Sequence, residues 1–214
     1  MIFTKLEHSG CVIENNGKKI ICDPVEIEDK MPELDNAVAL IITHKHGDHF
    51  QLEAIEKIVT TSPEIQIFAP QDLEIAEIAG RKVEKVEAGV GWNLEDFNLK
   101  FFGKNHAEII PGKIPCANIG VVVNDKIVNP GDSFDLPDNL PNPELLMVPS
   151  EAPWIKSYES MNYIKNAKPA IAIPVHNAIL SKFGNNINNN WLKMACEETD
   201  TKLAALEAGE SIEI

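Results

Sequence analysis

Ala37-Val38-Ala39-Leu40-Ile41-Ile42 runs through Thr43 into His44-Lys45-His46-Gly47-Asp48-His49, and this stretch indicates the fold more clearly than any other. Its apolar half predicts a buried strand, so the polar half should form a loop at the carboxyl end of that strand. Imidazole and carboxylate groups suit Zn²⁺, Mn or Fe, and the lack of cysteine here argues against a closed structural zinc site. The alternative is a chance run of histidines on a surface loop. Half of the six histidines of the chain lie here, which favours a metal site.

Three more potential ligands follow later in the chain, each just beyond a predicted strand. They are His106 in Gly103-Lys104-Asn105-His106-Ala107, Asp132 in Asn129-Pro130-Gly131-Asp132-Ser133 and His176 in Ile173-Pro174-Val175-His176-Asn177. Taken alone, either histidine could be an ordinary polar or core residue, and the aspartate could be a turn residue. Their order behind the first cluster makes them candidate metal ligands.

With these residues the chain resembles the metallo-β-lactamase superfamily, whose HxHxDH hallmark stands intact from His44 to His49. Gly10-Cys11-Val12-Ile13, Asp23-Pro24 and Ala152-Pro153-Trp154 look like its small branch of ascorbate-phosphate lactonase-like hydrolases. The resemblance implies an α/β (α+β) fold, a four-layer αββα sandwich formed by one domain over residues 1–214. It also implies metals at one edge, between the two sheets.

The resemblance further implies which ligands would hold each of two metal ions. One ion would be held by His44, His46 and His106, a second by Asp48, His49 and His176, and Asp132 would bridge them. A bridging carboxylate reduces the repulsion between two divalent ions about 3.5–4 Å apart. Water held by both metals would lose a proton near neutral pH, so Asp48, Asp132 and a metal-bound hydroxide are the expected catalytic groups. Zinc is the first expectation, with manganese or iron as alternatives.

Several further residues lie near the expected ligand loops. Asp23, at the end of a predicted strand, could accept the second N–H of a ligand histidine, since metal-bound imidazoles usually donate to an outer acceptor. His8 is the one histidine outside the ligand set, and it could face the site or be structural. Possible substrate contacts, each with a structural role as the alternative, are Lys104, Asn105, Asn118, Trp154, Tyr158 and Asn177.

Hydrophobic patterns predict strands alternating with helices. The expected strands are 2–6, 11–14, 18–22, 38–42, 65–68, 97–102, 119–123, 126–128, 145–148, 170–173 and 202–206. Helical spacing appears around 52–59, 71–79, 158–164 and 191–195. The segment 184–190, rich in asparagine, reads as a polar loop that leads into the last helix.

Composition limits the partners. The chain of 214 residues has 19 Lys plus Arg against 33 Asp plus Glu, a formal charge of −14, and Arg81 is its one arginine. Nucleic-acid affinity depends on basic residues, so duplex DNA or RNA is not expected, and a small molecule is the expected substrate. No apolar run is long enough for a membrane helix, and the first residues show no secretory signal. We therefore expect a cytoplasmic protein with reduced cysteines, and the sequence leaves the oligomeric state open.

These observations favour a metal-dependent hydrolase of a small-molecule ester or lactone, or of a phosphodiester. The single arginine and the lactonase-like resemblance tilt the balance towards a lactone or carboxylic ester. Asp132 stands where the best-known antibiotic-degrading members have cysteine, which argues against an antibiotic-resistance role. The alternatives are an iron-dependent oxidoreductase on the same fold, a nuclease-type activity and a metal-binding module without catalysis.

Overall fold

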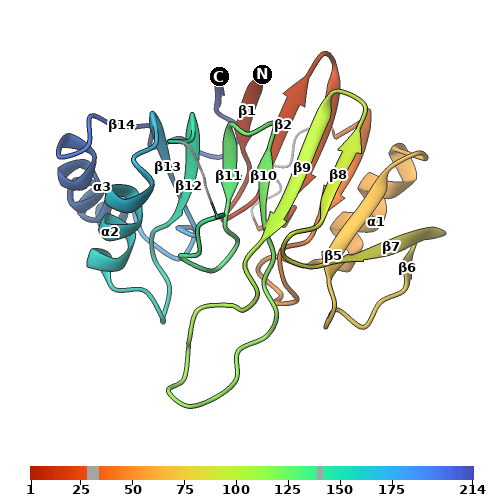
Figure 1. Cartoon of the computed structure of the whole chain (residues 1–214), viewed down its shortest axis with the longest axis horizontal. Coiled ribbons are helices and arrows are strands. Elements are labelled where there is room, and N and C mark those ends of the chain that lie inside the picture. Colours follow the sequence, from red (N-terminus) through yellow and green to blue (C-terminus); the bar gives the residue numbers. More distant parts are fainter. Residues whose placement is uncertain (28–33, 139–141) are drawn as a thin grey trace.

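Two β-sheets lie face to face at the centre of the structure, a computed structural model that describes residues 1–27, 34–138 and 142–214 (Figure 1). The first sheet has the order β15-β1-β2-β3-β4-β5-β7-β6 and the second the order β14-β13-β12-β11-β10-β9-β8. The strands of the first sheet are β1 (Ile2–Lys5), β2 (Cys11–Asn15), β3 (Lys18–Cys22), β4 (Ala37–Ile41), β5 (Gln66–Pro70), β6 (Glu77–Ile78), β7 (Arg81–Val86) and β15 (Ser211–Glu213). Those of the second are β8 (Gly91–Leu94), β9 (Phe97–Phe102), β10 (Gly120–Val123), β11 (Ile127–Asn129), β12 (Leu145–Pro149), β13 (Ile171–Val175) and β14 (Lys202–Leu203).

In the part of the chain that the structure describes, three helices cover the outer faces of the sheets: α1 (Leu52–Thr61), α2 (Ser157–Ala167) and α3 (Lys182–Glu197). The helix α1 buries Ile55, Ile58 and Val59 in a cluster with residues of β4 and β5. The helices α2 and α3 pack on the second sheet, at the far side of the molecule from α1 (Figure 1). The predicted αββα sandwich is therefore confirmed.

The alternation of side chains along the central strands explains these layers. Leu145 and Met147 of β12 point into the space between the two sheets, whereas Leu146 and Val148 pack beneath α2 and α3. Successive side chains of a strand point to opposite faces, and a strand buried on both faces reads as a continuous apolar run. The same rule explains why β4 is apolar throughout.

The predicted helix over residues 71–79 is wrong. Glu77–Ile78 forms the short strand β6, which pairs antiparallel with the start of β7. Ala79 and Gly80, with φ of 45° and 79°, make the turn between them. Two consecutive residues with positive φ suit a tight hairpin and end any helix, so the tertiary pairing overrides the local apolar spacing. The expected pattern also missed β7, β8 and β15.

The last helix begins earlier than the sequence suggests, and residues 184–190 are not a loop. Ser181 caps α3, because its Oγ accepts the backbone N–H of Gly184 at 3.2 Å. Buried Asn188 then donates to the carbonyl oxygen of Ser150 at 2.6 Å, which ties the asparagine-rich turns to the second sheet. A good cap and one buried hydrogen bond thus outweigh the weak helix propensity of asparagine.

The loop over residues 103–118 leaves the sheets and projects well beyond them, at the end of the molecule opposite to the two chain termini (Figure 1). Strands β9 and β10 flank this loop. Within the described residues, no helix is both long and apolar enough to cross a membrane.

Candidate metal centre

Six strands end at the sheet edge from which this loop projects, and each is followed by candidate site residues. Within each sheet the strands concerned run parallel to one another, β1 with β3 and β4, and β9 with β11 and β13. Their carboxyl ends therefore meet at one edge, which is where open α/β sheets usually bind ligands. The residues so placed are His8 after β1, Asp23 after β3, the 44–49 segment after β4, His106 after β9, Asp132 after β11 and His176 after β13.

The first expected ligand group comes together. His44, His46 and His106 place potential ligand atoms within 4.8 Å of one another. The rings of His44 and His106 are buried, and that of His46 is half-buried. Three imidazole groups this close together could hold one divalent ion.

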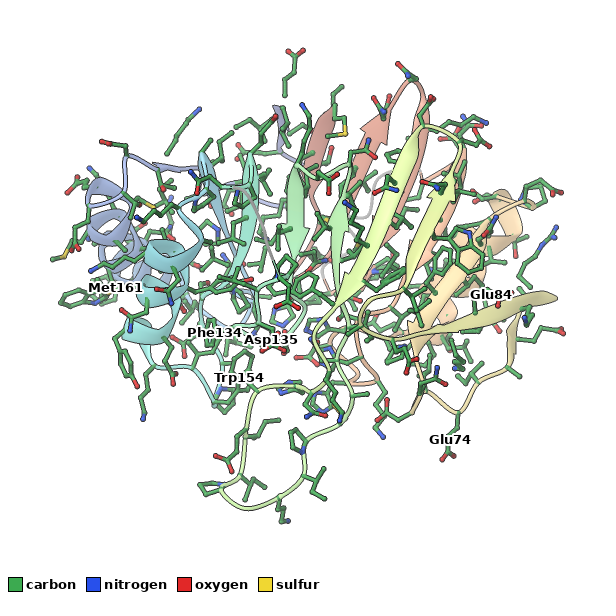
Figure 2. All side chains as sticks on the ribbon, in the orientation of Figure 1. Glu74, Glu84, Phe134, Asp135, Trp154 and Met161 are labelled. Atoms are coloured by element: carbon green, nitrogen blue, oxygen red, sulfur yellow. The ribbon has the colours of Figure 1, made fainter. Side chains whose placement is uncertain are left out.

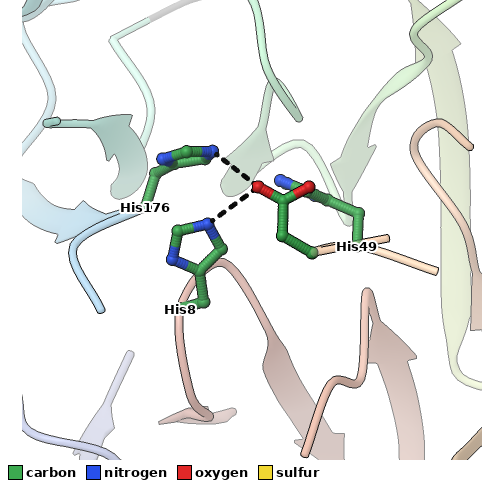
Figure 3. A group of neighbouring side chains, drawn as sticks. His8, His49 and His176 are labelled. Atoms are coloured by element: carbon green, nitrogen blue, oxygen red, sulfur yellow. Dashed lines mark ion pairs between the residues drawn. The ribbon is translucent and has the colours of Figure 1, made fainter. Parts of the chain in front are cut away.

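The second group also comes together and gains a member. Asp48, His49 and His176 lie with His8 in one cluster whose potential ligand atoms are all within 4.8 Å (Figure 3). The Nε2 atoms of His8 and His176 lie 3.4 and 3.5 Å from Oδ2 of Asp48. The side chain of Asp48 is 49% exposed, whereas the three rings are buried, so Asp48 is the member that reaches solvent.

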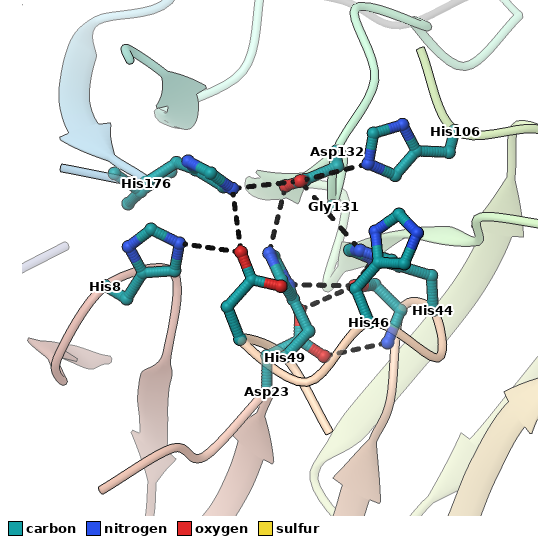
Figure 4. A network of polar contacts seen from close by, with 12 residues as sticks. His8, Asp23, His44, His46, His49, His106, Gly131, Asp132 and His176 are labelled. Atoms are coloured by element: carbon teal, nitrogen blue, oxygen red, sulfur yellow. Dashed lines mark hydrogen bonds and ion pairs between the residues drawn. The ribbon is translucent and has the colours of Figure 1, made fainter. Parts of the chain in front are cut away.

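Asp132 lies between the two groups (Figure 4). Its Oδ2 is 3.2 Å from Nε2 of His106 and 3.0 Å from Nε2 of His176, so one oxygen contacts both groups. Its Oδ1 lies 3.1 Å from Nε2 of His49. This buried carboxylate therefore occupies the position that a bridging ligand needs.

The outer nitrogens of the histidines fix which way their lone pairs point. Nδ1 of His106 lies 2.7 Å from the carbonyl oxygen of Ala107, and Nδ1 of His176 lies 2.6 Å from that of Glu151. A carbonyl oxygen can only accept a hydrogen bond, so each Nδ1 carries the proton. In each neutral ring Nε2 is therefore left with a lone pair directed into the site.

Asp23 orders the 44–49 loop in the same way. Its Oδ2 accepts from Nδ1 of His49 at 2.8 Å, as an outer acceptor would. The same carboxylate accepts the backbone N–H of Thr43 at 2.8 Å and the Thr43 hydroxyl at 2.6 Å. With its proton committed to Asp23, the Thr43 oxygen can accept from Nδ1 of His44 at 3.1 Å. The sequence did not single out Thr43, although it directly precedes the histidine motif.

These contacts test whether a metal would fit. Nε2 of His44, His49, His106 and His176 and Oδ1 of Asp132 are all buried without a hydrogen-bond partner among the described residues. Lone pairs of imidazole and carboxylate face one another there, which is unfavourable unless a cation lies between them. Atoms about 2.1 Å from one tetrahedral ion lie about 3.4 Å apart, close to the observed separations. The donor set fits divalent metal ions.

The electrostatics of the metal-free centre agree with this fit. Burial opposes protonation of His176, yet Asp132 and Asp48 raise its pKa to about 9. Burial likewise opposes charge on His49, yet Asp132 and Asp23 raise its pKa well above the ordinary value. Burial and the neighbouring His49 instead lower the pKa of His44 to about 2. The carboxylates thus attract positive charge that the crowded histidines share unequally, and a divalent cation would satisfy them all.

Three residues of the centre have strained backbone. His8, Asp23 and His176 have φ of 54°, 43° and 60°, in the left-handed region that non-glycine residues seldom adopt. Such conformations cost on the order of 1–3 kcal/mol each and concentrate at functional sites. All three lie around the Asp48 group.

The candidate substrate residues differ in how close they lie to the metal centre. The Trp154 ring lies against the site, its centroid 5.1 Å from that of His106 and 6.0 Å from that of His176 (Figure 2). Lys104 and Asn105 are exposed at the base of the projecting loop, next to His106. Asn177 donates instead to Asn185 of α3.

Two other candidates have no place in the centre. The side chain of Asn118 donates to the carbonyl oxygen of Pro130 at 2.8 Å and accepts the backbone N–H of Asp132 at 2.9 Å, so it shapes the loop of the bridging ligand. Tyr158 is an exposed residue of α2.

Cys116 was not expected here, yet its Sγ lies 3.6 Å from Nε2 of His46. No local pattern marks this cysteine, because the projecting loop returns it to the site.

Known proteins resemble this chain in sequence and in fold. Residues 3–176 match the family model described as beta-lactamase superfamily domain. Protein Rv0786c of Mycobacterium tuberculosis (strain ATCC 25618 / H37Rv) is 27% identical over 186 residues, which cover 85% of this chain and 86% of that protein. Igni18, a metallo hydrolase from the archaeon Ignicoccus hospitalis, superimposes with a TM-score of 0.74 at 19% identity, over 100% of this chain and 98% of Igni18. CmlA, a diiron beta-hydroxylase from Streptomyces venezuelae, gives 0.76 at 10% identity, and the match covers 100% of this chain but 54% of CmlA. The chain therefore belongs to the beta-lactamase superfamily domain family, and it has the metallo-β-lactamase fold.

Proposed function

We propose that the protein is a metal-dependent hydrolase that opens a lactone or cleaves another carboxylic ester of a small molecule, as the lactonase-like branch of the family would. One observation carries the proposal: the buried carboxylate of Asp132 joins two histidine groups whose Nε2 lone pairs point inward. Such a set of donors has no evident structural purpose, since burying it without a cation is costly.

Each group would hold one ion. His44, His46 and His106 would hold the first, Asp48, His49 and His176 the second, and Asp132 both. Nitrogen and oxygen donors of this kind suit zinc, and they also suit manganese and iron. When bound, such ions polarise a substrate carbonyl and lower the pKa of water to near neutrality.

Asp48 is the member of the set nearest to solvent. Its side chain is 49% exposed while its Oδ2 remains against the second group. Contacts from His176 and His8 hold the pKa of Asp48 well below its usual range, so the carboxylate is ionised at neutral pH and would orient the attacking water by accepting a hydrogen bond rather than by taking its proton. Asp132 is also ionised, but it is buried and shared between the groups, so its role is to hold charge in place.

The surroundings favour an apolar acyl group. Trp154 presents its ring beside both histidine groups. The loop that projects from this edge carries exposed Ile109, Ile110 and Ile114, of which Ile114 is 95% exposed. The Trp154 ring and the apolar side chains of this loop suit an uncharged ester more than a phosphate, and the overall charge of −14 disfavours anionic substrates.

A panel of substrates tests the proposal. Protein loaded with zinc or manganese should hydrolyse lactones and aryl esters faster than bis-aryl phosphodiesters, and chelation should abolish the activity. Asp132→Ala should be inactive at equal folded concentration. Faster turnover of the phosphodiester would identify a phosphodiester, and not an ester, as the substrate class. Equal turnover by Asp132→Ala would refute the two-metal hydrolase.

Iron chemistry is the second candidate, favoured by the fold shared with the diiron hydroxylase and by a donor set that binds iron well. Metal analysis of protein purified without added metal, combined with an oxygen-uptake assay, separates the two. Iron with substrate-dependent oxygen uptake would establish the oxidoreductase. Ester turnover without oxygen uptake would exclude it. The reducing cytoplasm is the compartment that we propose for either activity.

A further inference from the structure

His8 differs from the other histidines of the centre in the direction of its lone pair. Its Nδ1 accepts the backbone N–H of Ala178 at 3.4 Å. A backbone amide can only donate, so this nitrogen must carry the lone pair, and in the neutral ring the proton lies on Nε2. Nε2 of His8 is therefore an N–H donor, whereas in His106 and His176 Nε2 carries the lone pair.

Among the described residues, Asp48 is the one carboxylate in ion-pair contact with Nε2 of His8. The buried Nε2 lies 3.4 Å from Oδ2 of Asp48, a contact longer than an ordinary hydrogen bond (Figure 3). Asp48 is the most exposed carboxylate of the centre, and once a metal ion is bound, Nε2 of His176 would serve as a ligand and no longer donate to Asp48. A metal-binding carboxylate needs such an outer donor to fix its orientation.

Hydrogen bonds and close packing hold the turn that carries His8 in a fixed position. It is closed by hydrogen bonds from Leu6 N to Gly10 O and from Gly10 N to Glu7 O, both at 2.9 Å. The buried ammonium of Lys5 donates to the carbonyl oxygens of Leu6 and His8, and burial lowers its pKa to about 8. A side chain at Gly10 would lie 2.9 Å from the carbonyl oxygen of Asp23, so the turn packs closely against the metal edge. The positive φ of His8 and the burial of the Lys5 ammonium both cost free energy, and both hold the His8 ring in its position.

We infer that His8 is a positioning residue: its Nε2–H donates to Asp48 and fixes that carboxylate towards the second metal position, while His8 itself binds no metal. This inference rests on the proposed metal-dependent function. It follows that His8 acts on the affinity for the second ion and leaves the first untouched.

The chain offers a matched pair of variants. Asn in place of His8 puts an amide near the Nδ1 position, keeps an acceptor for Ala178 and tolerates the positive φ, but it does not reach Asp48. Gln reaches the Nε2 position with an N–H donor. Calorimetric zinc titration should show a second ion bound 10- to 100-fold more weakly by His8→Asn. His8→Gln should stay within a few-fold of the wild type, and the first ion should be unaffected in both variants.

Long-range proton–nitrogen NMR of ¹⁵N-histidine-labelled protein provides the direct test. In zinc-loaded protein His8 should show a protonated Nε2 and no metal-induced shift, while Nε2 of His106 and His176 should shift strongly. A metal-shifted Nε2 or a protonated Nδ1 on His8 would overturn the inference and leave the hydrolase intact. Equal loss of the second ion in His8→Asn and His8→Gln would do the same. Protein that binds no metal would overturn the proposed function as well.

A separate observation concerns the outer face of α3. Phe183, Ile187, Trp191 and Met194 follow one another at intervals of four, four and three residues, and each is 44–75% exposed. At 100° per residue they share one face, opposite the face that buries Leu192 and Cys196. The helix thus has two apolar sides, of which the sheet covers one.

Charge indicates what covers the other side. Residues 183–192 contain no charged side chain, although the chain as a whole carries −14. Like charge is the main obstacle to self-association of so acidic a protein, and this neutral face avoids it. The net charge also disfavours an anionic membrane surface. A fully exposed aromatic residue presents about 150–250 Å², so the four side chains expose on the order of 400 Å², a large part of the roughly 800 Å² that each partner of a standard interface buries.

We propose that this face binds the same face of a second copy, with the two α3 helices packed about a twofold axis. Sedimentation velocity should find the mass of two chains at micromolar concentration. Trp191→Glu should sediment as one chain with an unchanged circular-dichroism spectrum, while the control Ile114→Glu, on the projecting loop, should remain a dimer. A wild-type monomer at every concentration would overturn the proposal, and so would a dimer that survives both Trp191→Glu and Phe183→Glu.

Discussion

Nδ1 of His49 donates to Oδ2 of Asp23 across 2.8 Å, and neither side chain is accessible to solvent. This contact joins the end of β3 to the loop after β4 and directs the other nitrogen of His49 at Asp132. Asp23 itself has a strained φ of 43°. The centre thus depends on a carboxylate that would touch no metal.

Replacement of Asp23 by Asn should therefore weaken metal binding without touching a ligand. The variant keeps the shape but removes the charge that orients and polarises His49, and loss of an outer acceptor typically costs 10- to 100-fold in affinity. Competition of zinc against a fluorescent chelator measures this. Glu64→Gln, at a side chain that is 95% exposed, is the control. Zinc affinity equal in the two variants would show that Asp23 is only a turn residue.

The stability of metal-free protein should fall as the pH rises from 6.5 to 8. His176 has a folded pKa of about 9, above its unfolded value near 6.5, so its contribution is complete below pH 6.5 and is lost as the pH rises through 9. The raised pKa of His49 acts in the same direction, whereas the lowered pKa of His44 adds little in this window. Lys5, with a pKa lowered to about 8, gives an opposing slope only above that pH. The loss from the two histidines should be up to about 3 kcal/mol. Urea unfolding at each pH measures it, with His176→Asn as the control that should reduce the slope by about half. A free energy of unfolding that stays level in the wild type would contradict the prediction.

Trp154→Ala should raise the KM for an apolar ester several-fold and change kcat little. The ring would contact the substrate away from the reacting bond, and an aromatic contact contributes about 0.5–1.5 kcal/mol. Steady-state kinetics of the metal-loaded protein test this, with exposed Tyr158→Ala as the comparison. A drop in kcat at unchanged KM would mean that Trp154 supports the ligands rather than the substrate.

Metal should protect Cys116 from alkylation. Cys116 is half-buried beside His46, whereas Cys11, Cys22 and Cys196 are buried. Burial raises the pKa of the Cys116 thiol, so labelling by iodoacetamide should be slow, confined to this site and slower still once His46 holds an ion. Mass spectrometry of labelled peptides follows the rate with and without zinc. Equal rates would indicate that His46 stays free when metal binds.

Much of the candidate metal centre could be predicted from local sequence. The apolar run before His44 and the position of each later ligand behind a strand predicted that the ligands follow strand ends, because the strand period and the ligand chemistry are both local properties. The resemblance to the metallo-β-lactamase superfamily implied that they meet at one sheet edge. What the sequence could not supply depends on contacts between distant residues. The hairpin at Ala79-Gly80 overrides a helical spacing, and the cap at Ser181 extends α3 through its asparagines.

The same limit applies within the centre. The carbonyl of Glu151, the hydroxyl of Thr43 and the Ala178 amide set the proton positions of the histidines, and they come from backbone or from unremarkable residues. No motif marks them, because the tautomer of a histidine depends on what lies against its outer nitrogen after folding. For that reason the sequence left open whether His8 faces the site or is structural.

The number of metal ions per chain distinguishes a two-metal centre shared through Asp132 from a site for a single ion. Plasma mass spectrometry of zinc-loaded, dialysed protein should find two ions in the wild type and fewer than two in Asp132→Asn, because the variant keeps the shape of the shared carboxylate but loses the charge that offsets repulsion between the ions. One ion or none in the wild type, or two ions retained by Asp132→Asn, would contradict the shared two-metal centre.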